Sequence, residues 1–459
     1  MNRRSFLTAA AGAAASAAAG RPMNVLFVVS DDLSPTALGC YGHPIVRSPN
    51  IDSLARTGTR FDRAYCQYAL CAPSRASFLT GLRPNTTRVL TNGPDFREFI
   101  PNAVTMPQLF KNNGYQVIRE GKMFHMGVPT TVGTDRWQDA ASWTHNGSPQ
   151  GKEHHSRGEG RNLTPKHLEG RAMNVVKTPD AAEQADFDAA NRAIAHIEKH
   201  RDVPFFLGLG FVRPHVPLVA PGKYFDMYPL ARIKPFAGPP GDNDDIPEIV
   251  PRTLGDTAGN MGMDQDRQRE ALRAYYACIS FMDDQLGRVL ETLRRLHLRG
   301  NTVIVFQSDH GWHLGEHGFW QKRSLMEESA RVPLIISAPG RRGRGRASRA
   351  IAELVDVYPT VAGLCGLTPP RNLEGKSLAA VLDDPSREHK ATAHTQLDVG
   401  STHGRAVRTE HFRYIRWTWA GGVAEELYDH RRDPHEFTNL AGKPEFEKEL
   451  ARHRRLVGA

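Results

Sequence analysis

Two pairs of polar residues in the sequence could bind a cation. Asp31 and Asp32 come at the end of one mostly apolar run, and Asp309 and His310 come at the end of another. Adjacent carboxylates repel each other unless a cation lies between them, and oxygen ligands with one imidazole suit a hard divalent ion. Each pair alone is better explained by a helix cap or a turn. The carboxyl ends of parallel strands meet in one crevice, so both pairs could lie there together. A shared metal site and two separate turns are therefore equally good interpretations of the two pairs.

The segment 71–81, with the sequence CAPSRASFLTG, predicts a short helix that begins at a cysteine. Pro73 suits the first turn of a helix, and Gly81 suits its end. The helix dipole would favour negative charge on Cys71, and Arg75, one turn later, would project beside it. The residues alone therefore predict an activated cysteine with an arginine partner. A buried structural cysteine is the alternative.

Strands alternating with helices must position these side chains. Mostly apolar runs, typical of strands buried on both faces, occur at 24–29, 115–118, 205–211, 303–306 and 333–336. Residues 264–297 carry apolar side chains at three- and four-residue steps, as an amphipathic helix does. We therefore expect an α/β fold, with a large, mostly parallel central sheet flanked by helices on both faces. Ligands would bind beyond the carboxyl ends of its strands.

The C-terminal part shows a different pattern. Residues 369–459 predict a small α+β subdomain with short strands in an antiparallel sheet, closed by a charged helix near 445–456. We expect residues 21–368 to form the catalytic domain. Within it, the polar segment 129–180 has no clear periodicity and is expected to be a surface excursion beside the substrate cleft.

Composition excludes several classes of protein. The chain has 459 residues, of which 24% are charged and 40% hydrophobic, as in globular proteins. No stretch offers about 20 strongly apolar residues, so we expect no stable membrane insertion. The net charge of +9 favours anionic partners, acidic polysaccharides as well as nucleic acid, and does not decide between them. No nucleic-acid-binding motif accompanies the charge, so we expect no nucleic-acid partner. Five cysteines are too few for a disulfide scaffold, although an oxidising compartment would permit pairing among Cys40, Cys66, Cys278 and Cys365.

Residues 1–20 are typical of an export signal. Two arginines, then a Phe-Leu pair, are followed by an alanine-rich run with small residues in an A-x-A arrangement. The pattern resembles the bacterial twin-arginine signal, which implies the twin-arginine export machinery as a partner and a periplasmic or secreted location. A disordered alanine-rich tail is the alternative.

The sequence resembles a known family. The pattern Cys-x-Pro-Ser-Arg-x-x-x-Leu-Thr-Gly at 71–81 is the signature of the formylglycine-dependent sulfatases of the alkaline phosphatase superfamily. The resemblance runs from residue 24 to about residue 440. It includes the segments 50–55, 121–125, 355–360, 426–429 and 433–434. The segments 213–217 and 308–322 are most similar to the iduronate-2-sulfatase branch. An alkaline phosphatase-like fold is therefore expected.

The resemblance implies a modified nucleophile and a cation. In the family a maturation enzyme oxidises the signature cysteine, here Cys71, to formylglycine. One hydroxyl of the hydrated aldehyde attacks sulfur, and loss of a proton from the other expels sulfate. One divalent cation, expected to be calcium, polarises the sulfate. The expected ligands are Asp31, Asp32, Asp309, His310 and an oxygen of modified Cys71.

The resemblance also implies roles for five further side chains. Arg75 would stabilise the hydrated aldehyde, and Lys122 and Lys322 would hold sulfate oxygens. His125 would accept the proton of the second hydroxyl, and His215 would donate a proton to the bridging oxygen. The lysines could otherwise be surface residues, and His215 could be a plain turn residue.

The expected activity is hydrolysis of sulfate esters on a sulfated sugar or polysaccharide. Arg213 departs from the lysine usual in the branch, and the segment after Pro217 matches no pattern, so specificity for uronic acid does not follow. Two alternatives remain. The same site could hydrolyse phosphonate or phosphate diesters, or the chain could be a non-catalytic binder of sulfated polysaccharide with Cys71 unmodified.

Overall fold

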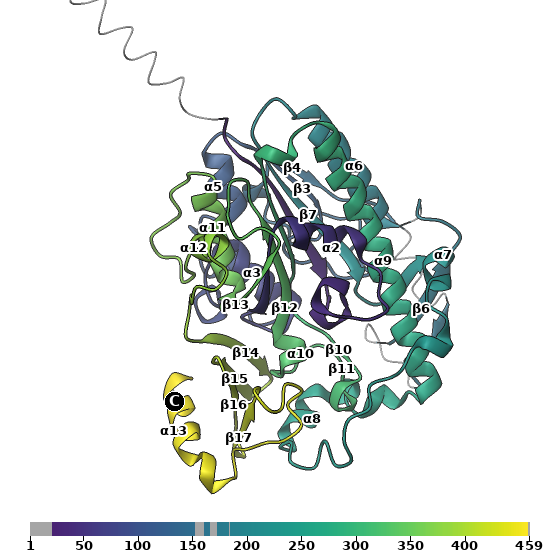
Figure 1. The fold of residues 1–459 in the computed structure, drawn as a ribbon, viewed down its shortest axis with the longest axis vertical. Helices are drawn as coiled ribbons and strands as arrows, with labels where there is room; N and C mark the ends of the chain where they lie inside the picture. The colour runs from purple at the N-terminus through teal and green to yellow at the C-terminus, as the bar shows by residue number, and fades with distance from the viewer. Residues whose placement is uncertain (1–20, 152–159, 166–171, 183, 458–459) are drawn as a thin grey trace, which may run out of the picture.

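A mixed sheet of eight strands forms the centre of the molecule (Figure 1). The computed structural model describes residues 21–151, 160–165, 172–182 and 184–457, so the expected signal at 1–20 lies outside the described residues. The strands are, in spatial order, β13 (Arg346–Glu353), β2 (Thr59–Tyr65), β12 (Arg331–Ser337), β9 (Thr302–Ser308), β1 (Asn24–Asp31), β7 (Phe205–Pro214), β3 (Gln116–Gly121) and β4 (His145–Gly147). β12 runs antiparallel to β2 and β9, and the other adjacent pairs are parallel. The mostly parallel sheet predicted from the sequence is confirmed.

Helices cover both faces of this sheet, which explains the continuous apolar runs. In β1, Leu26 and Val28 face one hydrophobic cluster, while Val25, Phe27 and Val29 face the other. The first cluster lies under α2 (Pro49–Thr57), α6 (Ala185–Lys199) and α9 (Gln265–Arg295). The second lies under α3 (Cys71–Thr80), α5 (Met106–Asn112) and α11 (Val357–Leu364). Because side chains alternate along a strand, a strand covered on both faces must be apolar throughout.

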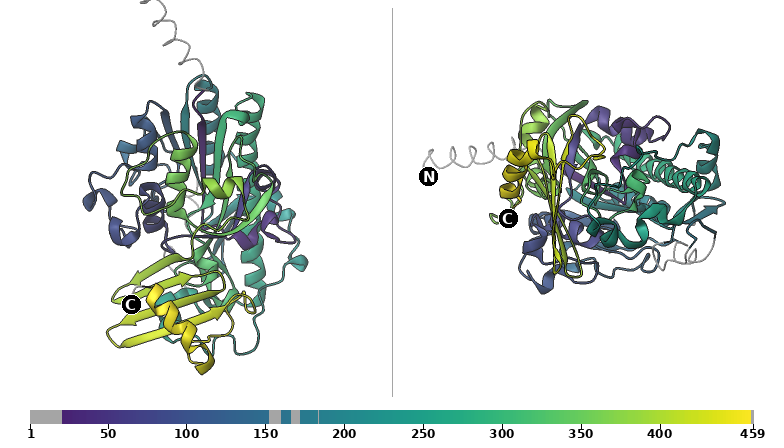
Figure 2. Two further views of the ribbon diagram at one scale, coloured as in Figure 1. Left: turned by 60° about the vertical axis from the view of Figure 1, so that its left-hand side comes forward. Right: turned by 90° about the horizontal axis from the view of Figure 1, so that it is seen from below.

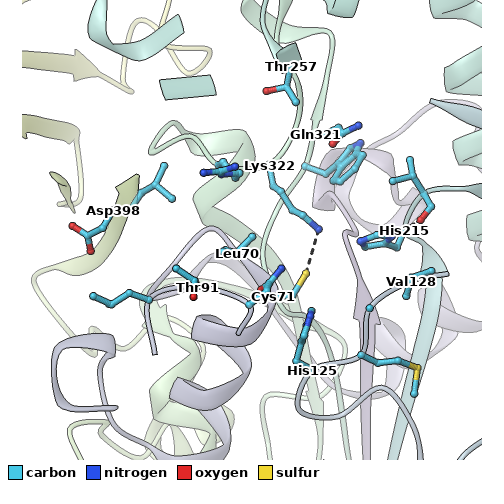
Figure 3. Close-up of a pocket in the computed structure, with 18 residues that line it drawn as sticks. Leu70, Cys71, Thr91, His125, Val128, His215, Thr257, Gln321, Lys322 and Asp398 are labelled. Carbon is cyan, nitrogen blue, oxygen red and sulfur yellow. Dashed lines mark hydrogen bonds between the residues drawn. The ribbon is translucent and has the colours of Figure 1, made fainter. Parts of the chain in front are cut away.

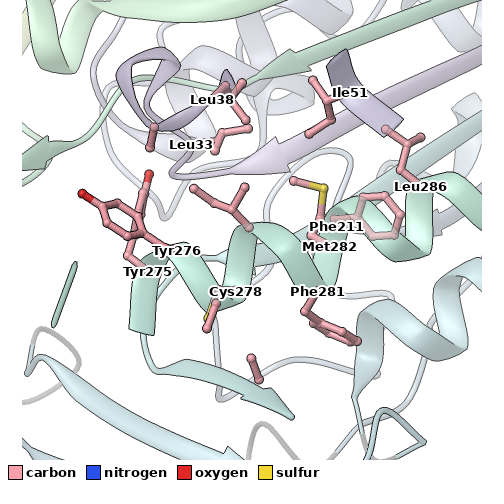
Figure 4. Packing of buried hydrophobic residues seen from close by; sticks show 14 of the residues in the cluster. Leu33, Leu38, Ile51, Phe211, Tyr275, Tyr276, Cys278, Phe281, Met282 and Leu286 are labelled. Atoms are coloured by element: carbon pink, nitrogen blue, oxygen red, sulfur yellow. The ribbon is translucent and has the colours of Figure 1, made fainter. Parts of the chain in front are cut away.

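The helix α9 confirms the amphipathic helix that the periodicity of residues 264–297 predicts. The side chain of Asp264 accepts a hydrogen bond from the backbone N–H of Arg267 and so caps the helix. Its apolar stripe packs on residues that follow β1 and on α2, and Met282 and Leu286 lie close to Ile51 (Figure 4). The long helix therefore anchors the loop that leaves β1.

A second, antiparallel sheet forms most of the C-terminal part. It consists of β14 (Ala393–Val399), β15 (Thr402–Arg408), β16 (Phe412–Trp419) and β17 (Gly422–Asp429), with α13 (Glu447–Leu456) across one face (Figure 2). Tyr414 packs toward Leu450 of α13, whereas Ile415 and Trp417 pack toward Tyr68 and Leu325 of the larger part. The predicted strands and terminal helix are confirmed.

The segment 129–180 contains more regular structure than the sequence indicated. Besides β4, it holds β5 (Arg161–Asn162) and β6 (Asn174–Thr178), which form a small sheet with β8 (Leu218–Pro221). Besides several 3-10 turns, the remaining short α-helices and strands of the described residues are α4 (Pro84–Thr87), α7 (Gly222–Asp226), α8 (Ile249–Leu254), α10 (Glu327–Ala330), α12 (Ala379–Asp383) and the pair β10 (His313–Leu314) and β11 (Trp320–Gln321). Within the described part of the chain, no helix is both long and apolar enough to span a bilayer.

Candidate active site

The predicted site residues meet at one edge of the central sheet. Ser30 of β1 lies opposite Ser308 of β9, so the pairs Asp31–Asp32 and Asp309–His310, which directly follow these two serines, are level with each other. Asp31 lies opposite Pro214 at the end of β7, which brings the 213–217 loop to the same edge. Because β12 is antiparallel, its amino end also lies here, and the segment that contains Lys322 precedes it. One edge therefore collects residues that are hundreds of positions apart in the sequence.

Four buried side chains form a compact group of donor atoms. Single ligand atoms of Asp31, Asp32, Cys71 and His310 all lie within 4.8 Å of one another. The Nε2 atom of His310 is 3.4 Å from Oδ1 of Asp32 and 3.6 Å from Oδ2 of Asp309. The five predicted ligands are therefore brought together, with the Asp309 carboxylate beside the other four.

The donor set of this group fits a divalent cation. The Nδ1 atom of His310 donates to the carbonyl of Gly311 at 2.9 Å, so the neutral ring presents the lone pair of Nε2 to the carboxylates. Among the described residues, Oδ2 of Asp32 has no hydrogen-bond partner although it is buried. Burial raises the pKa of Asp32 to about 8, and a cation would offset this by stabilising its ionised form. Carboxylate oxygens and one imidazole nitrogen suit a hard ion such as calcium.

Three cations pair with these carboxylates, of which Arg75 and Lys122 are fully buried and Lys322 is partly exposed to the pocket. Lys122 Nζ lies 2.6 Å from Oδ2 of Asp31, and Lys322 Nζ lies 2.6 Å from Oδ1 of Asp32. Arg75 joins two strand ends, because its Nε donates to Asp309 at 2.8 Å and its Nη2 to Asp31 at 3.2 Å. Burial alone would raise the pKa of Asp31, but the charges led by Lys122 hold it well below its ordinary value.

The turn after β3 aims Lys122 into the site. Gly121 has a φ of +84°, and a Cβ atom there would lie 2.0 Å from the carbonyl oxygen of Gly210. Only glycine allows β3 to approach β7 so closely in this conformation. Glycine at 121 is therefore part of how the chain positions Lys122.

Cys71 is the first residue of α3, and Gly81 follows the helix in the left-handed conformation, as predicted. The Sγ atom of Cys71 lies 3.3 Å from Nε2 of His310 and 3.2 Å from Nζ of Lys322. Burial raises the pKa of the Cys71 thiol to about 12, despite the opposing charges of Lys122 and Lys322. The unmodified thiol therefore stays protonated at neutral pH, contrary to the predicted activation, because burial outweighs the charges of the two lysines.

Two histidines face this centre from opposite loops. Burial lowers the pKa of His125 to about 2 and that of His215 well below its ordinary value, so both rings are neutral. Among the described residues, Nδ1 of His125 has no hydrogen-bond partner. His215 donates its Nδ1 hydrogen to the carbonyl of Val216 at 2.5 Å and directs Nε2 to Asp32 at 3.6 Å. His215 must therefore gain a proton on Nε2 before it can act as an acid.

A pocket of about 370 Å³ opens onto these residues (Figure 3). Cys71 lies at its base with His125, His215 and Lys322 around it. The remaining lining residues come from several loops, from a 3-10 turn and from β11 and β14: Leu70, Leu90, Thr91, Asn92, Met126, Gly127, Val128, Val216, Thr257, Trp312, Gln321, Arg323, Leu397 and Asp398. A small polar group can therefore reach Cys71 while a larger body fills the outer part.

Part of this wall was not predicted from the sequence. Asp398 comes from the C-terminal sheet, where nothing in its sequence marks it, whereas Arg323 directly follows Lys322 and its basic side chain could have been noted. The segment 129–180 reaches this region through Trp137, whose ring centroid lies 5.5 Å from that of His125 and which lines a small hollow with His125 and Asn92, so this part of the segment lies beside the cleft as expected. Arg213 does not line the pocket; it donates to the carbonyls of His215 and Pro217 and so braces their loop.

The comparisons with known proteins agree with this geometry. A family model described as Sulfatase matches residues 23–367, and one described as N-sulphoglucosamine sulphohydrolase, C-terminal, matches residues 315–456. The chain is 36% identical to iduronate 2-sulfatase of Homo sapiens over 390 residues, which cover 76% of this chain and 70% of that protein. It is 32% identical to a sulfatase of Formosa agariphila over 442 residues, which cover 93% and 84% of the two chains.

Solved structures share the fold. A protein in complex with its substrate D-glucosamine-2-N,6-O-disulfate superposes with a TM-score of 0.75 at 24% identity, covering 95% of this chain and 97% of the other. A phosphonate monoester hydrolase of Agrobacterium radiobacter superposes with a TM-score of 0.77 at 23% identity, covering 95% and 94%. The alkaline phosphatase-like architecture is thus confirmed. The family models and the sequence relatives place this chain in the sulfatase family, whose members hydrolyse sulfuric esters.

Proposed function

We propose that this enzyme removes sulfate from a sulfated sugar or polysaccharide, with formylglycine made from Cys71 and one bound calcium ion. The observation that carries the proposal is the meeting of Asp31, Asp32, His310 and Cys71 with two lysine ammonium groups at the base of one pocket. The high pKa of the unmodified thiol supports the need for conversion, since a thiol in this site is a weak nucleophile at neutral pH.

Two groups absent from the chain as synthesised would complete the site. Formylglycine at position 71 would supply a hydrated aldehyde, with one hydroxyl as the nucleophile toward sulfur and a second hydroxyl whose proton can be lost when sulfate leaves. Asp31, Asp32, Asp309 and His310 would hold the calcium ion, which supplies positive charge that polarises the sulfate. Arg75 would keep Asp31 and Asp309 in place and stabilise negative charge at position 71.

The chain's own charges prepare the site for an anion. The carboxylates of Asp31, Asp32 and Asp309 are balanced by Arg75, Lys122 and Lys322, so a bound divalent ion leaves an excess of positive charge. A sulfate ester carries one negative charge and would be attracted to it. Lys122 and Lys322 would bind sulfate oxygens and stabilise the charge that develops in the transition state.

Proton transfer would fall to the two histidines. His125 is neutral, and within the described part of the chain its Nδ1 atom has no hydrogen-bond partner, which supports its role as acceptor of a proton from the residue at position 71. His215, once it has taken up a proton from solvent on Nε2, would donate that proton to the oxygen that leaves with the sugar, since its Nδ1 hydrogen is bound to the carbonyl of Val216. The outer pocket offers Trp312 as an apolar surface and Asn92 as a hydrogen-bonding group for the sugar.

Maturation and export would precede activity. We infer that a formylglycine-generating enzyme acts on Cys71 in the cytosol and that the twin-arginine machinery then carries the folded protein to the periplasm or beyond, because that route carries folded cargo. Blocking export should leave an aldehyde-bearing precursor inside the cell. A precursor with only a thiol at position 71 would contradict this order.

The test of the activity is a comparison of matched substrates. Matured enzyme is assayed with an aryl sulfate, the corresponding aryl phosphodiester and the aryl phosphonate, and then with sulfated disaccharides. We expect kcat/KM for the sulfate to exceed that for the phosphorus esters by more than about 100-fold. Equal or faster hydrolysis of the phosphorus esters would instead assign the site to phosphonate or phosphate diester hydrolysis.

A further inference from the structure

A second group of metal-ligating side chains lies away from the pocket, between β3, β4 and α6. In the parallel pairing of β3 with β4, Ile118 lies opposite His145 and Glu120 opposite Gly147. Glu120 and His145 therefore project from the same face of the sheet, since they are two register positions apart. α6 packs on this part of the sheet and contributes His196.

Both imidazoles point at one carboxylate oxygen. The Nε2 atoms of His145 and His196 each lie 3.1 Å from Oε1 of Glu120, and the two ring centroids are 4.4 Å apart. One ligand atom from each of the three residues lies within 4.8 Å of the other two. Two nitrogens and one oxygen thus surround a single small space.

The carboxylate lacks a permanent positive partner in the described part of the chain. Glu120 is fully buried, its ion pairs there are with the two histidines, and its Oε2 atom has no hydrogen-bond partner. The neighbouring Arg119 directs its guanidinium elsewhere, to Asn146, Ser148 and the carbonyl of Gly121. A buried carboxylate is costly unless a positive charge and hydrogen bonds compensate it, so the orphan oxygen indicates a missing ligand.

The backbone keeps this space open. A Cβ atom on Gly147 would lie 2.2 Å from both carboxylate oxygens of Glu120. No other residue at 147 would leave the carboxylate in its position under the two imidazoles. The glycine therefore preserves the arrangement of the three ligand atoms.

We propose that Glu120, His145 and His196 bind a zinc ion. Zinc takes two histidines and one carboxylate at about 2.0–2.2 Å in approximate tetrahedra, so its ligand atoms lie about 3.3–3.5 Å apart. The observed 3.1 Å needs only a slight opening, and neutral rings can present their Nε2 lone pairs by carrying their hydrogen on Nδ1. The side chain of His145 is 47% exposed, which gives the ion an entry path and leaves a fourth position for water.

This site differs in chemistry from the calcium site of the proposed function and does not depend on it. Imidazole nitrogens favour zinc, whereas the pocket offers mainly carboxylate oxygens. Bound zinc would tie the edge strand β4 and the helix α6 to β3, two residues before Lys122. Because zinc would bind the folded chain and not the unfolded chain, it would raise the free energy of unfolding. It would take no part in the hydrolysis.

The test is zinc binding to the full chain saturated with calcium, measured by competition with a chromophoric chelator and without any sulfate ester. We expect one zinc ion per chain. The affinity for zinc should fall in His196→Ala and in His145→Ala. The loss should exceed roughly 10- to 100-fold, which is typical when a residue that only hydrogen-bonds to a metal ligand is removed. His200→Ala is the matched control, since its ring stacks beside His196 with centroids 6.0 Å apart but supplies no ligand atom to the group.

Cobalt substitution provides a second measurement. Cobalt bound at this site should give visible d–d absorption of a four- or five-coordinate ion, which His145→Ala abolishes and His200→Ala keeps. If His196→Ala fails to fold, His145→Ala at the half-exposed edge strand decides the question alone. Absence of zinc binding by the calcium-saturated wild type, or unchanged affinity in a folded His145→Ala variant, would overturn the proposal. Either result leaves the sulfatase activity to be judged by its own assay.

Discussion

The Nζ atom of Lys322 lies 3.2 Å from the Sγ atom of Cys71, although 251 residues separate the two in the sequence. The same ammonium lies 2.6 Å from Oδ1 of Asp32. One cation therefore contacts both the position of the nucleophile and a carboxylate of the candidate cation site. Negative charge that develops on a sulfate bound at position 71 would meet it directly.

Replacing Lys322 by alanine should lower kcat for an aryl sulfate by about 10²–10³-fold, because one preorganised charge in a water-excluded site is lost from the transition state. Steady-state kinetics on matured enzyme measures this. Lys223→Ala is the control, since that lysine is exposed and lies over the ring of Tyr224, away from the pocket. Unchanged turnover in Lys322→Ala would remove this residue from the reaction.

Replacing His215 by alanine should impair sugar sulfates far more than aryl sulfates. An alkoxide leaving group needs a proton from an acid, which contributes typically about 10²–10⁴-fold, whereas a nitrophenolate leaves without one. The measurement is kcat for both substrate types in the variant and the wild type. Equal losses on the two substrates would show that His215 positions the substrate and does not protonate it.

Removing the cation should abolish activity and calcium should restore it. Asp32→Asn should raise the calcium concentration needed for half-maximal activity, because the ligand set loses a buried carboxylate, one oxygen of which has no hydrogen-bond partner among the described residues. Activity is followed during calcium titration of chelator-treated enzyme. Asp62→Asn, which changes a half-buried ion pair with Arg60 on β2, should leave the titration unchanged. A chelator-treated enzyme that retains full activity would exclude a catalytic cation.

Glu353 should make stability depend on pH near the junction of the two sheets. Burial favours a raised pKa, but Lys390 and Arg83 lower the pKa of Glu353 to about 2, below its ordinary value near 4.5. Its stabilisation is therefore complete above about pH 4.5 and is lost as the pH falls toward 2.

Glu353→Gln should consequently lower the free energy of unfolding at pH 7 by about 2–3 kcal/mol, and its difference from the wild type should shrink as the pH falls below 4.5. Denaturant unfolding at several pH values measures both. Glu291→Gln, at an exposed pair with Arg294, should change little at any pH. A difference that stays constant down to pH 3 would show that the ion pairs of Glu353 do not stabilise the fold.

The strands that could be predicted from the sequence are those buried on both faces. β1, β7 and β9 are continuous apolar runs because helices cover both sides. β2 and β13 were missed because charged residues interrupt them, as in Arg60 and Asp62 of β2, which are only half-buried. The opposite direction of β12 was also not predictable, since the apolar pattern of a buried strand does not specify its direction.

The inner site was predictable because its residues follow strand ends and belong to one long motif. The resemblance supplied the roles of Lys122 and His215, which the residue types alone left as surface and turn residues. The pocket wall was not predictable, because Asp398 reaches it through packing of the C-terminal sheet on Tyr68 and its neighbours. Nor did local sequence indicate the raised pKa of Cys71, which arises from burial by segments distant in the chain.

The most direct test of the account measures the aldehyde content of position 71 against activity. The tryptic peptide 64–75 contains both Cys66 and Cys71, so the buried Cys66 serves as an internal control that should remain a thiol. Preparations matured to different extents are analysed by mass spectrometry and assayed with an aryl sulfate. We expect kcat per chain to rise in proportion to the fraction with formylglycine at position 71 and to extrapolate to zero without it. Full turnover in a preparation that holds only the thiol would contradict it.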